Sequence, residues 1–260
     1  MMKRKLILIF LLLVCIAGLQ SPAFAKSKTV KNGWVKKNGT CYYYQNGKKL
    51  TGLKKIGTKY FYFDKKGIQK TGWRKIKKDY YFFQIKKGKQ GYMVCSRKVN
   101  GIQLKKSGKA SVKTARNLRK AKLLVHYQEW ADKLTKRSMT KKEKLLTVFN
   151  YLRKNLLYVG SIHLDIYAED FVIEGAEYIY DTGTCFECHT IACATAYLAN
   201  AIGYEDIQIC AHSGHGWVEI EGLIYDTSLS RHNKSSYPYF ATSDRDGQEW
   251  PKEVIKDMRE

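Results

Sequence analysis

Residues 183–228 read GTCFECHTIACATAYLANAIGYEDIQICAHSGHGWVEIEGLIYDTS and contain four cysteines and three histidines. The segment fits four interpretations: covalent haem attachment, a zinc site, disulfide bonds, or a cysteine nucleophile assisted by histidine and aspartate. Cys185, Cys188 and the histidine after them match the CxxCH haem pattern. The same two cysteines, together with His212 and His215, have the spacing of a zinc site.

The sequence downstream favours the nucleophile. Residues 215–220 and 223–226 read as two strands joined by a turn. If the hairpin loop has an even number of residues, Asp226 lies opposite Trp217, one pleat from His215 on the same face. We therefore expect the Asp226 carboxylate to reach the His215 imidazole, a contact that neither the haem nor the zinc interpretation requires.

A helix is predicted upstream of these strands, over about 186–201 and ending before Gly203. Alanines recur four, eight and eleven residues after Cys188, so one face of the helix can press closely on a sheet. Cys188 then lies near the helix N-terminus. The amides of a helix N-terminus and a nearby imidazolium both favour the thiolate form of a cysteine.

These residues resemble the transglutaminase-like superfamily of papain-like fold. The family pattern is a Cys that opens a helix, Ala four residues on, a Leu/Ile-Gly ending at fifteen, His-x-Trp on one strand, and Asp on the next. The matching residues are Cys188, Ala192, Ile202-Gly203, His215-Gly216-Trp217 and Tyr225-Asp226-Thr227-Ser228. The resemblance covers about 140–230 and implies a catalytic triad of Cys188, His215 and Asp226 that uses no cofactor and no metal.

The choice of nucleophile rests on the position of the helix start. The family usually has Gly two residues before the nucleophile, and Gly183-Thr184-Cys185 has this form whereas Phe186-Glu187-Cys188 does not. A capping box formed by Thr184 and Glu187 would also start the helix at Cys185. The length of the helix up to Gly203 favours Cys188, and Cys185 is the alternative.

The resemblance implies that Cys188 attacks a peptide or carboxamide carbonyl and forms a thioester, while His215 moves the proton and Asp226 orients the imidazole. Water as acceptor would make the protein a peptidase or amidase, and an amine would make it an acyltransferase. The sequence does not choose between them. Two alternative functions are a wall-binding protein whose triad domain is inactive, and a zinc or haem protein.

The N-terminal half contains a repeat. Gly33, Gly52, Gly72 and Gly91 are spaced 19, 20 and 19 residues apart, and an aromatic cluster follows each of the first three by eight or nine residues. Short aromatic runs separated by glycine-containing turns predict β-hairpins that stack on one another. The fourth unit lacks the cluster, and we expect it to be a cap.

The segment GWVKKNGTCYYYQNGKKLTG, residues 33–52, resembles the cell-wall-binding repeats of choline- and glucan-binding proteins from Gram-positive bacteria. Choline sites in that family are aromatic cages that hold a quaternary ammonium by cation–π attraction. The ligand-binding residues that the resemblance suggests are Trp34, Tyr43, Tyr62, Trp73 and Tyr81.

The net charge of +24 is concentrated in the repeats. Residues 26–110 hold 25 Lys or Arg and 2 acidic residues, whereas residues 161–260 hold 6 basic and 18 acidic residues. A module with this much positive charge repels a cation at long range. We therefore favour an anionic wall polysaccharide as the partner, with choline-bearing teichoic acid as the alternative. A nucleic-acid partner is not expected for an exported protein.

The first 25 residues predict export. A basic start, an apolar run over 6–19 and Ala-Phe-Ala at 23–25 form a secretory signal peptide, and the run is shorter than the roughly 20 residues that span a bilayer. We expect a secreted, wall-associated protein that begins near Lys26 and has no membrane segment after cleavage.

The chain is predicted to have an α+β fold in three parts: a signal peptide at 1–25, hairpin repeats at 26–110 and a transglutaminase-like domain at 111–260. Two scaffold helices are expected in the third part, over about 112–137 and 141–156. Thr140 and Glu143 form a capping-box pattern at the start of the second helix.

Overall fold

The computed structural model describes residues 31–86, 91–160, 164–212, 214–228, 240–242 and 253–258, and the predicted signal peptide lies outside these ranges. The described residues form helices together with several small, mostly antiparallel sheets, so the fold mixes α and β elements. None of the helices in this part of the chain is both long enough and apolar enough to cross a bilayer.

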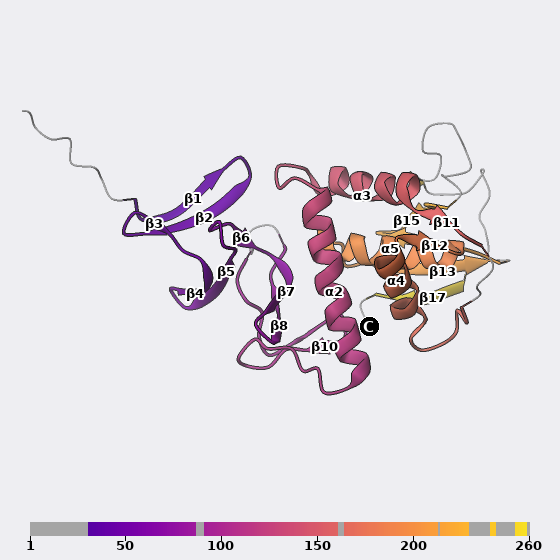
Figure 1. The fold of residues 1–260 in the computed structure, drawn as a ribbon, viewed down its shortest axis with the longest axis horizontal. Coiled ribbons are helices and arrows are strands. Elements are labelled where there is room, and N and C mark those ends of the chain that lie inside the picture. Colours follow the sequence, from indigo (N-terminus) through magenta and orange to yellow (C-terminus); the bar gives the residue numbers. More distant parts are fainter. Residues whose placement is uncertain are drawn as a thin grey trace, which may run out of the picture.

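Three β-hairpins follow one another along the N-terminal half and lie at the left of Figure 1. Each begins at a repeat glycine and carries its aromatic cluster on the second strand. The paired strands are β1 (Gly33–Lys37) with β2 (Thr40–Gln45), β4 (Gly52–Ile56) with β5 (Lys59–Phe63), and β7 (Gly72–Ile76) with β8 (Asp79–Phe83). Two short strands, β3 (Lys48–Lys49) and β6 (Gln69–Lys70), extend the first two hairpins. The hairpins predicted from the repeat are confirmed.

The hairpins have tight turns and contact one another through aromatic rings. Asn38 and Gly39 join β1 to β2 with φ angles of 49° and 74°, as expected for a two-residue turn that follows the twist of the strands. The ring of Trp34 lies 5.0 Å from that of Phe61 in the next hairpin. Such contacts let units that are too small to bury their own faces stabilise one another.

The fourth unit pairs with the second and third hairpins and does not form another hairpin with an aromatic cluster. Tyr92 and Met93 form isolated bridges with Phe61 and Phe83. A short hairpin follows, made of β9 (Lys98–Val99) and β10 (Ile102–Gln103), and Ile102 is fully buried.

A long helix, α2 (Ala115–Leu134), stands between the repeats and the rest of the molecule (Figure 1). The Arg74 guanidinium on β7 lies 2.8 Å from the Asp132 carboxylate on this helix. On the other side, the Gln128 amide donates a hydrogen bond of 3.0 Å to the carbonyl of Ala201. The helix therefore contacts both halves of the chain.

The next helix, α3 (Lys141–Asn155), begins at the predicted capping box. The backbone N–H of Glu143 donates to the Thr140 hydroxyl at 3.2 Å, and the backbone N–H of Thr140 donates to the Glu143 carboxylate at 2.7 Å. Both N-terminal donors are thus satisfied by the pair that the sequence indicates.

In the C-terminal half, one helix packs against a five-stranded antiparallel sheet and a second helix packs on the first. The helices are α4 (Phe171–Thr182) and α5 (Cys188–Ile202), and a short parallel pair, β11 (Leu157–Tyr158) with β12 (Thr184–Cys185), lies beside them. The order of the sheet is β16 (Phe240–Thr242), β15 (Leu223–Tyr225), β14 (His215–Ile220), β13 (Ile207–His212) and β17 (Glu253–Asp257). Helix α5 packs on β13 and β14.

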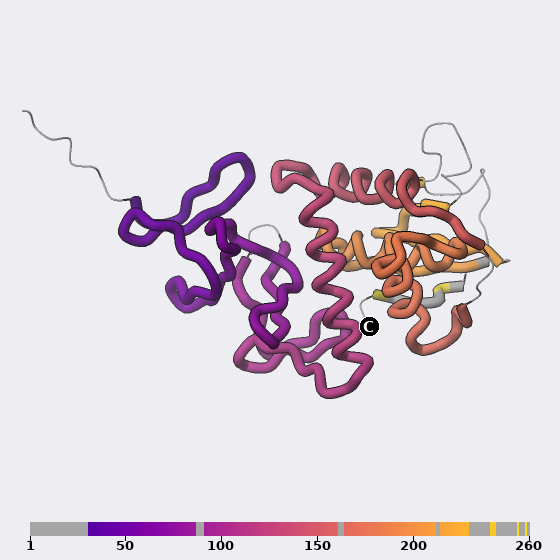
Figure 2. Tube along the Cα trace, viewed as in Figure 1, coloured from indigo at the N-terminus to yellow at the C-terminus, as the bar shows by residue number. Residues whose placement is uncertain are grey.

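The hydrophobic core continues across the predicted domain boundary at residue 110. Trp73, Ile102 and Leu104 belong to the same cluster of buried residues as Leu123 on α2 and Leu198 on α5. Figure 2 shows the chain passing from the hairpins into α2. The third hairpin and the fourth unit are therefore packed as part of the C-terminal half.

Candidate active site and repeat surface

Cys188 is the first residue of α5, which ends at Gly203 in the left-handed conformation. The backbone N–H of Glu187 donates to the Thr190 hydroxyl at 3.4 Å, which helps to cap the helix. Cys185 instead lies on β12, opposite Tyr158, and is fully buried. The helix therefore begins at Cys188, because the residues around Cys185 pair with another strand.

His215 and Asp226 meet across the hairpin formed by β14 and β15. Glu221 and Gly222 form its two-residue loop, and the pairing of Val218 with Tyr225 gives the even register expected from the sequence. The His215 Nε2 atom lies 2.7 Å from the Oδ2 atom of Asp226, whose side chain is fully buried. The Nδ1 atom of His215 remains for proton exchange with another group.

The Cys188 sulfur lies among several polar groups at the start of β14, the central strand of the sheet. The backbone N–H of Gly216 donates to Sγ at 3.2 Å, and the carbonyl oxygen of Gly214 lies 3.8 Å from it. The Nδ1 atom of His189 lies 3.6 Å from the same sulfur. Cys188 is also within hydrogen-bonding reach of His215, so the structure brings the three predicted triad residues together.

These contacts change the acidity of the thiol. Burial alone would raise the pKa of Cys188, but hydrogen bonds and charge from His189 and His215 outweigh burial and lower this pKa from 9.0 to about 6. By contrast, burial raises the pKa of Cys193, on the same helix, above the ordinary thiol value. Cys188 is thus set up to be a thiolate at neutral pH.

His215 is shifted in the complementary direction. Burial would lower the pKa of its imidazole, but the hydrogen bond to Asp226, together with Cys188, raises this pKa from 6.5 to about 9. The thiolate exists above about pH 6 and the imidazolium below about pH 9. An ion pair of thiolate and imidazolium is therefore the main form between these two values.

Further side chains hold the triad in place. The Ser228 hydroxyl donates to Asp226 Oδ1 at 3.1 Å, and the hydroxyls of Thr227 and Thr195 lie 3.0 Å apart, which ties the end of the hairpin to α5. The Trp217 ring lies nearly parallel to His215 at a centroid distance of 6.2 Å. The sequence motif contained Thr227 and Ser228, but only the fold shows their partners.

His189 has a position that the sequence analysis did not anticipate. The CxxCH pattern indicated haem attachment as one interpretation. In the structure the His189 imidazole instead lies beside the Cys188 sulfur. Over the described ranges, no group of three or more His, Cys, Asp or Glu side chains is placed to hold a metal ion.

The five predicted ligand-binding aromatics differ in their access to solvent. Trp34 is 46% exposed, and Tyr43, its partner across the hairpin, is partly exposed. Tyr62 is half-buried. Trp73 is 1% exposed and Tyr81 7% exposed, so burial removes these two from the surface that a ligand can reach.

Lysine side chains of the module cover several of its aromatic rings. The pairs, with the distance from Nζ to the ring centroid, are Lys49 with Tyr42 (4.1 Å), Lys59 with Tyr92 (4.3 Å), Lys31 with Tyr44 (4.6 Å) and Lys75 with Tyr80 (5.8 Å). Cation–π attraction holds an ammonium group over such a ring. These ring faces therefore already carry a cation that belongs to the protein.

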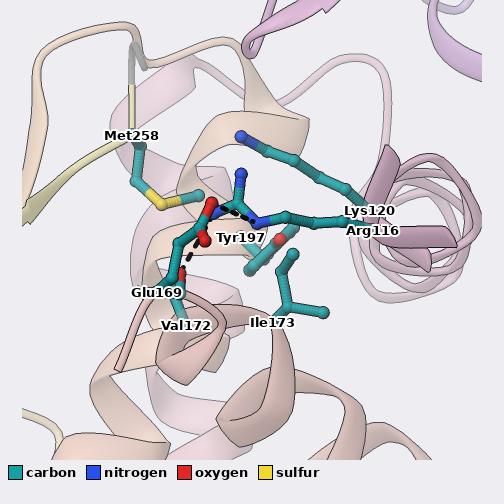
Figure 3. A pocket seen from close by; sticks show the side chains of 7 residues that line it. All are labelled: Arg116, Lys120, Glu169, Val172, Ile173, Tyr197 and Met258. Atoms are coloured by element: carbon teal, nitrogen blue, oxygen red, sulfur yellow. Dashed lines mark hydrogen bonds and ion pairs between the residues drawn. The ribbon is translucent and has the colours of Figure 1, made fainter. Parts of the chain in front are cut away.

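A small cavity lies apart from the triad (Figure 3). The residues that line it are Arg116, Lys120, Glu169, Val172, Ile173, Tyr197 and Met258. At its mouth, Arg116 is already paired with Glu169 at 3.3 Å and with Asp170 at 2.5 Å. None of the triad residues lines this cavity.

Solved structures similar to this chain include choline-binding proteins of Streptococcus pneumoniae. CbpJ from strain TIGR4 is 28% identical (TM-score 0.28), and the match covers 31% of this chain and 28% of CbpJ. Choline-binding protein F, determined with a peptidoglycan analogue, is 29% identical (TM-score 0.29), with 33% and 29% covered. The choline-binding domain of Spr1274 is 20% identical (TM-score 0.29), with 32% and 98% covered. No protein-family model matches the sequence, and no curated protein matches it.

Proposed function

We propose that this protein is a thioester-forming cysteine enzyme held at a cell-wall polymer by its repeats. The observation that carries the proposal is the Cys188, His215 and Asp226 cluster, in which a buried carboxylate holds the imidazole at 2.7 Å beside a thiol of lowered pKa. Cys188 is the nucleophile, His215 the acid and base, and Asp226 the group that orients the imidazole.

In the first half of the reaction, the Cys188 thiolate attacks a peptide or carboxamide carbonyl and a C–S bond forms. The backbone N–H of Cys188, the first residue of α5, stabilises the oxyanion. His215 then gives its proton to the leaving amine, the C–N bond breaks, and a thioester remains. In the second half, His215 takes a proton from water or from an amine, which attacks the thioester and releases the thiolate.

An assay that separates the two acceptors tests this proposal. Glutamine-containing peptides and isolated wall peptides would be incubated with and without a fluorescent alkylamine, while ammonia release, peptide cleavage and amine incorporation are followed. We expect Cys188→Ala to lower turnover at least about 10³-fold, because the nucleophile is lost. Cys95→Ala, which removes a partly exposed thiol on the fourth unit, serves as the control and retains turnover. Equal turnover by Cys188→Ala and the wild type would contradict the proposal.

The repeats are proposed to bind an anionic wall polymer. The excess of 25 basic over 2 acidic residues at 26–110 supports this choice, and so do the lysines that occupy the faces of Tyr42 and Tyr44. The exposed ring of Trp34 is available to stack on a sugar. Tethering would raise the local concentration of wall substrates without new contacts in the active site.

Binding to isolated walls should depend strongly on salt. We expect affinity to fall roughly tenfold or more between about 50 and 200 mM salt, because counterions are released when lysines contact a polyanion. The double variant Lys54→Gln/Lys55→Gln, which changes two exposed lysines of β4, should bind more weakly, whereas Lys133→Gln on α2 should not. Binding that persists at high salt and is displaced by free choline would favour choline-bearing teichoic acid instead.

A non-catalytic wall-binding protein is the second candidate. The observation that favours it is the low exposure of Cys188, which is 9%, so substrate access to the sulfur is narrow. Wall binding without turnover of any amide by the wild-type protein would support this candidate.

A further inference from the structure

The mechanism above leaves a buried imidazole beside the nucleophile unused. His189 is 5% exposed, and its Nδ1 atom lies 3.6 Å from Cys188 Sγ and 3.9 Å from Glu187 Oε2. Its Nε2 atom is buried and has no hydrogen-bond partner among the described residues. The ring therefore directs its one partnered nitrogen toward the sulfur.

Gly216 shows that the position of this ring is built into the fold. A Cβ atom at Gly216 would lie 2.3 Å from His189 Cδ2 and 2.9 Å from Cγ, closer than real contacts allow. The φ angle of Gly216 is not in the left-handed region, so the need for glycine here is a need for space. The same residue donates its N–H to Cys188 Sγ at 3.2 Å, and ring, backbone and sulfur form one contact cluster.

The surroundings favour a proton on Nδ1 of His189. The Glu187 carboxylate lies on the Nδ1 side, whereas Nε2 has no hydrogen-bond partner among the described residues. From α4, the neighbour is the uncharged ring of Phe171, 6.3 Å away. The other titratable groups around the sulfur are His215 on β14 and Tyr158 on β11.

We propose that His189 is a second imidazole partner of the nucleophile, which donates its Nδ1–H to the Cys188 sulfur independently of the Asp226–His215 pair. This donor stabilises the resting thiolate and the same thiolate when it leaves at thioester breakdown. The inference rests on the proposed function, in which Cys188 is the nucleophile, but it concerns a property that can be measured without substrate.

Two substitutions separate the donor from the ring. His189→Phe keeps an aromatic ring against Gly216 and removes the N–H, whereas His189→Asn retains an N–H near the position of Nδ1. Alkylation of Cys188 by iodoacetamide would be followed from pH 4.5 to 10 in the full chain, by mass spectrometry that resolves each cysteine. His126→Phe, which changes a histidine stacked on Tyr180 away from the sulfur, is the matched control.

We expect His189→Phe to raise the midpoint of alkylation by about one pH unit or more, with His189→Asn closer to the wild type and His126→Phe unchanged. An unchanged midpoint in folded His189→Phe would overturn the inference, and so would equal shifts in the Phe and Asn variants. Absence of Cys188 alkylation in the wild type at neutral pH would instead overturn the proposed function.

A measurement on the wild-type protein makes the test independent of how the variants fold. NMR of protein with ¹⁵N-labelled histidine reports which ring nitrogen carries the proton. We expect His189 to carry it on Nδ1 and its ¹⁵N shift to change when Cys188 is alkylated. A proton on Nε2 alone would overturn the inference, because Nδ1 could then not donate to the sulfur.

Discussion

Cys188 should be alkylated by iodoacetamide at neutral pH, with a half-maximal rate near pH 6. Lowering the pKa of a thiol makes the thiolate available above that pH, and the thiolate is the reactive form. Cys185 and Cys193 should stay unmodified in the folded protein because both are fully buried. Cys188→Ala should therefore lose the fast labelling, and Cys185→Ala should retain it.

Removing the His215 imidazole should raise the pH at which Cys188 alkylation is half-maximal, toward the ordinary thiol pKa of 9.0. In the limit of a full shift, the thiolate fraction at pH 7 falls about 90-fold, but a thiolate of higher pKa is also more nucleophilic, with a Brønsted coefficient of about 0.4–0.5. The net loss of rate for His215→Ala at pH 7 is then only about three- to sixfold. At pH 5.5 the expected loss is about 20- to 50-fold, so the comparison belongs at acid pH.

The high-pH side of the curve of Cys188 alkylation rate against pH reports on His215. Because the pKa of its imidazole is raised to about 9, the imidazolium persists up to that pH, and Asp226→Asn should lower this limit by removing the carboxylate. Cys95→Ala should leave the profile unchanged. A midpoint that stays near pH 6 in His215→Ala, or fast labelling of Cys185, would contradict the assignment of the ion pair.

The contact between His215 and Asp226 could be predicted from sequence because it is local. Two short strands separated by the two residues Glu221 and Gly222 have a register that the loop length fixes. The side chain at 215 and the residue after β15 then fall on one face whatever the rest of the chain does. The capping box of α3 was predictable for the same reason, since its partners are three residues apart.

The role of the residues around the sulfur depends on contacts between distant segments. The start of α5 must lie against β14 before the ring of His189 can occupy the space beside Gly216. Helix α4 was likewise not predicted, nor was β17, which pairs with β13 at the edge of the sheet. Long-range pairings of this kind leave little trace in local periodicity.

In the repeats, too, the surroundings of a residue could not be predicted from its sequence motif, as two copies of one motif show. Trp34 and Trp73 follow the repeat glycines of their hairpins, and the sequence assigned both to ligand binding. Trp34 is 46% exposed whereas Trp73 is 1% exposed. The difference arises because α2 and the fourth unit cover the third hairpin and leave the first one open.

This difference gives a matched pair of substitutions with unequal effects. Trp73→Ala should lower the free energy of unfolding by about 3–5 kcal/mol, the usual cost of truncating a buried aromatic side chain. It also removes the hydrogen bond of 2.9 Å from Trp73 Nε1 to Asn100. Trp34→Ala should cost about 1 kcal/mol, since it loses contacts with the Tyr43 and Phe61 rings at an open position. Urea unfolding followed by circular dichroism would measure both values.

The part of the protein that Trp73→Ala destabilises distinguishes a continuous core from two independent domains. If Trp73, α2 and α5 share one core, Trp73→Ala lowers the energy needed to open the C-terminal half as well. The buried thiol of Cys193 on α5 reports this opening, and its alkylation in the native state should accelerate in Trp73→Ala but not in Trp34→Ala. Loss of stability confined to the repeats, with Cys193 protected as in the wild type, would mean that the triad half folds on its own. In that case the repeats would affect the proposed activity through tethering alone.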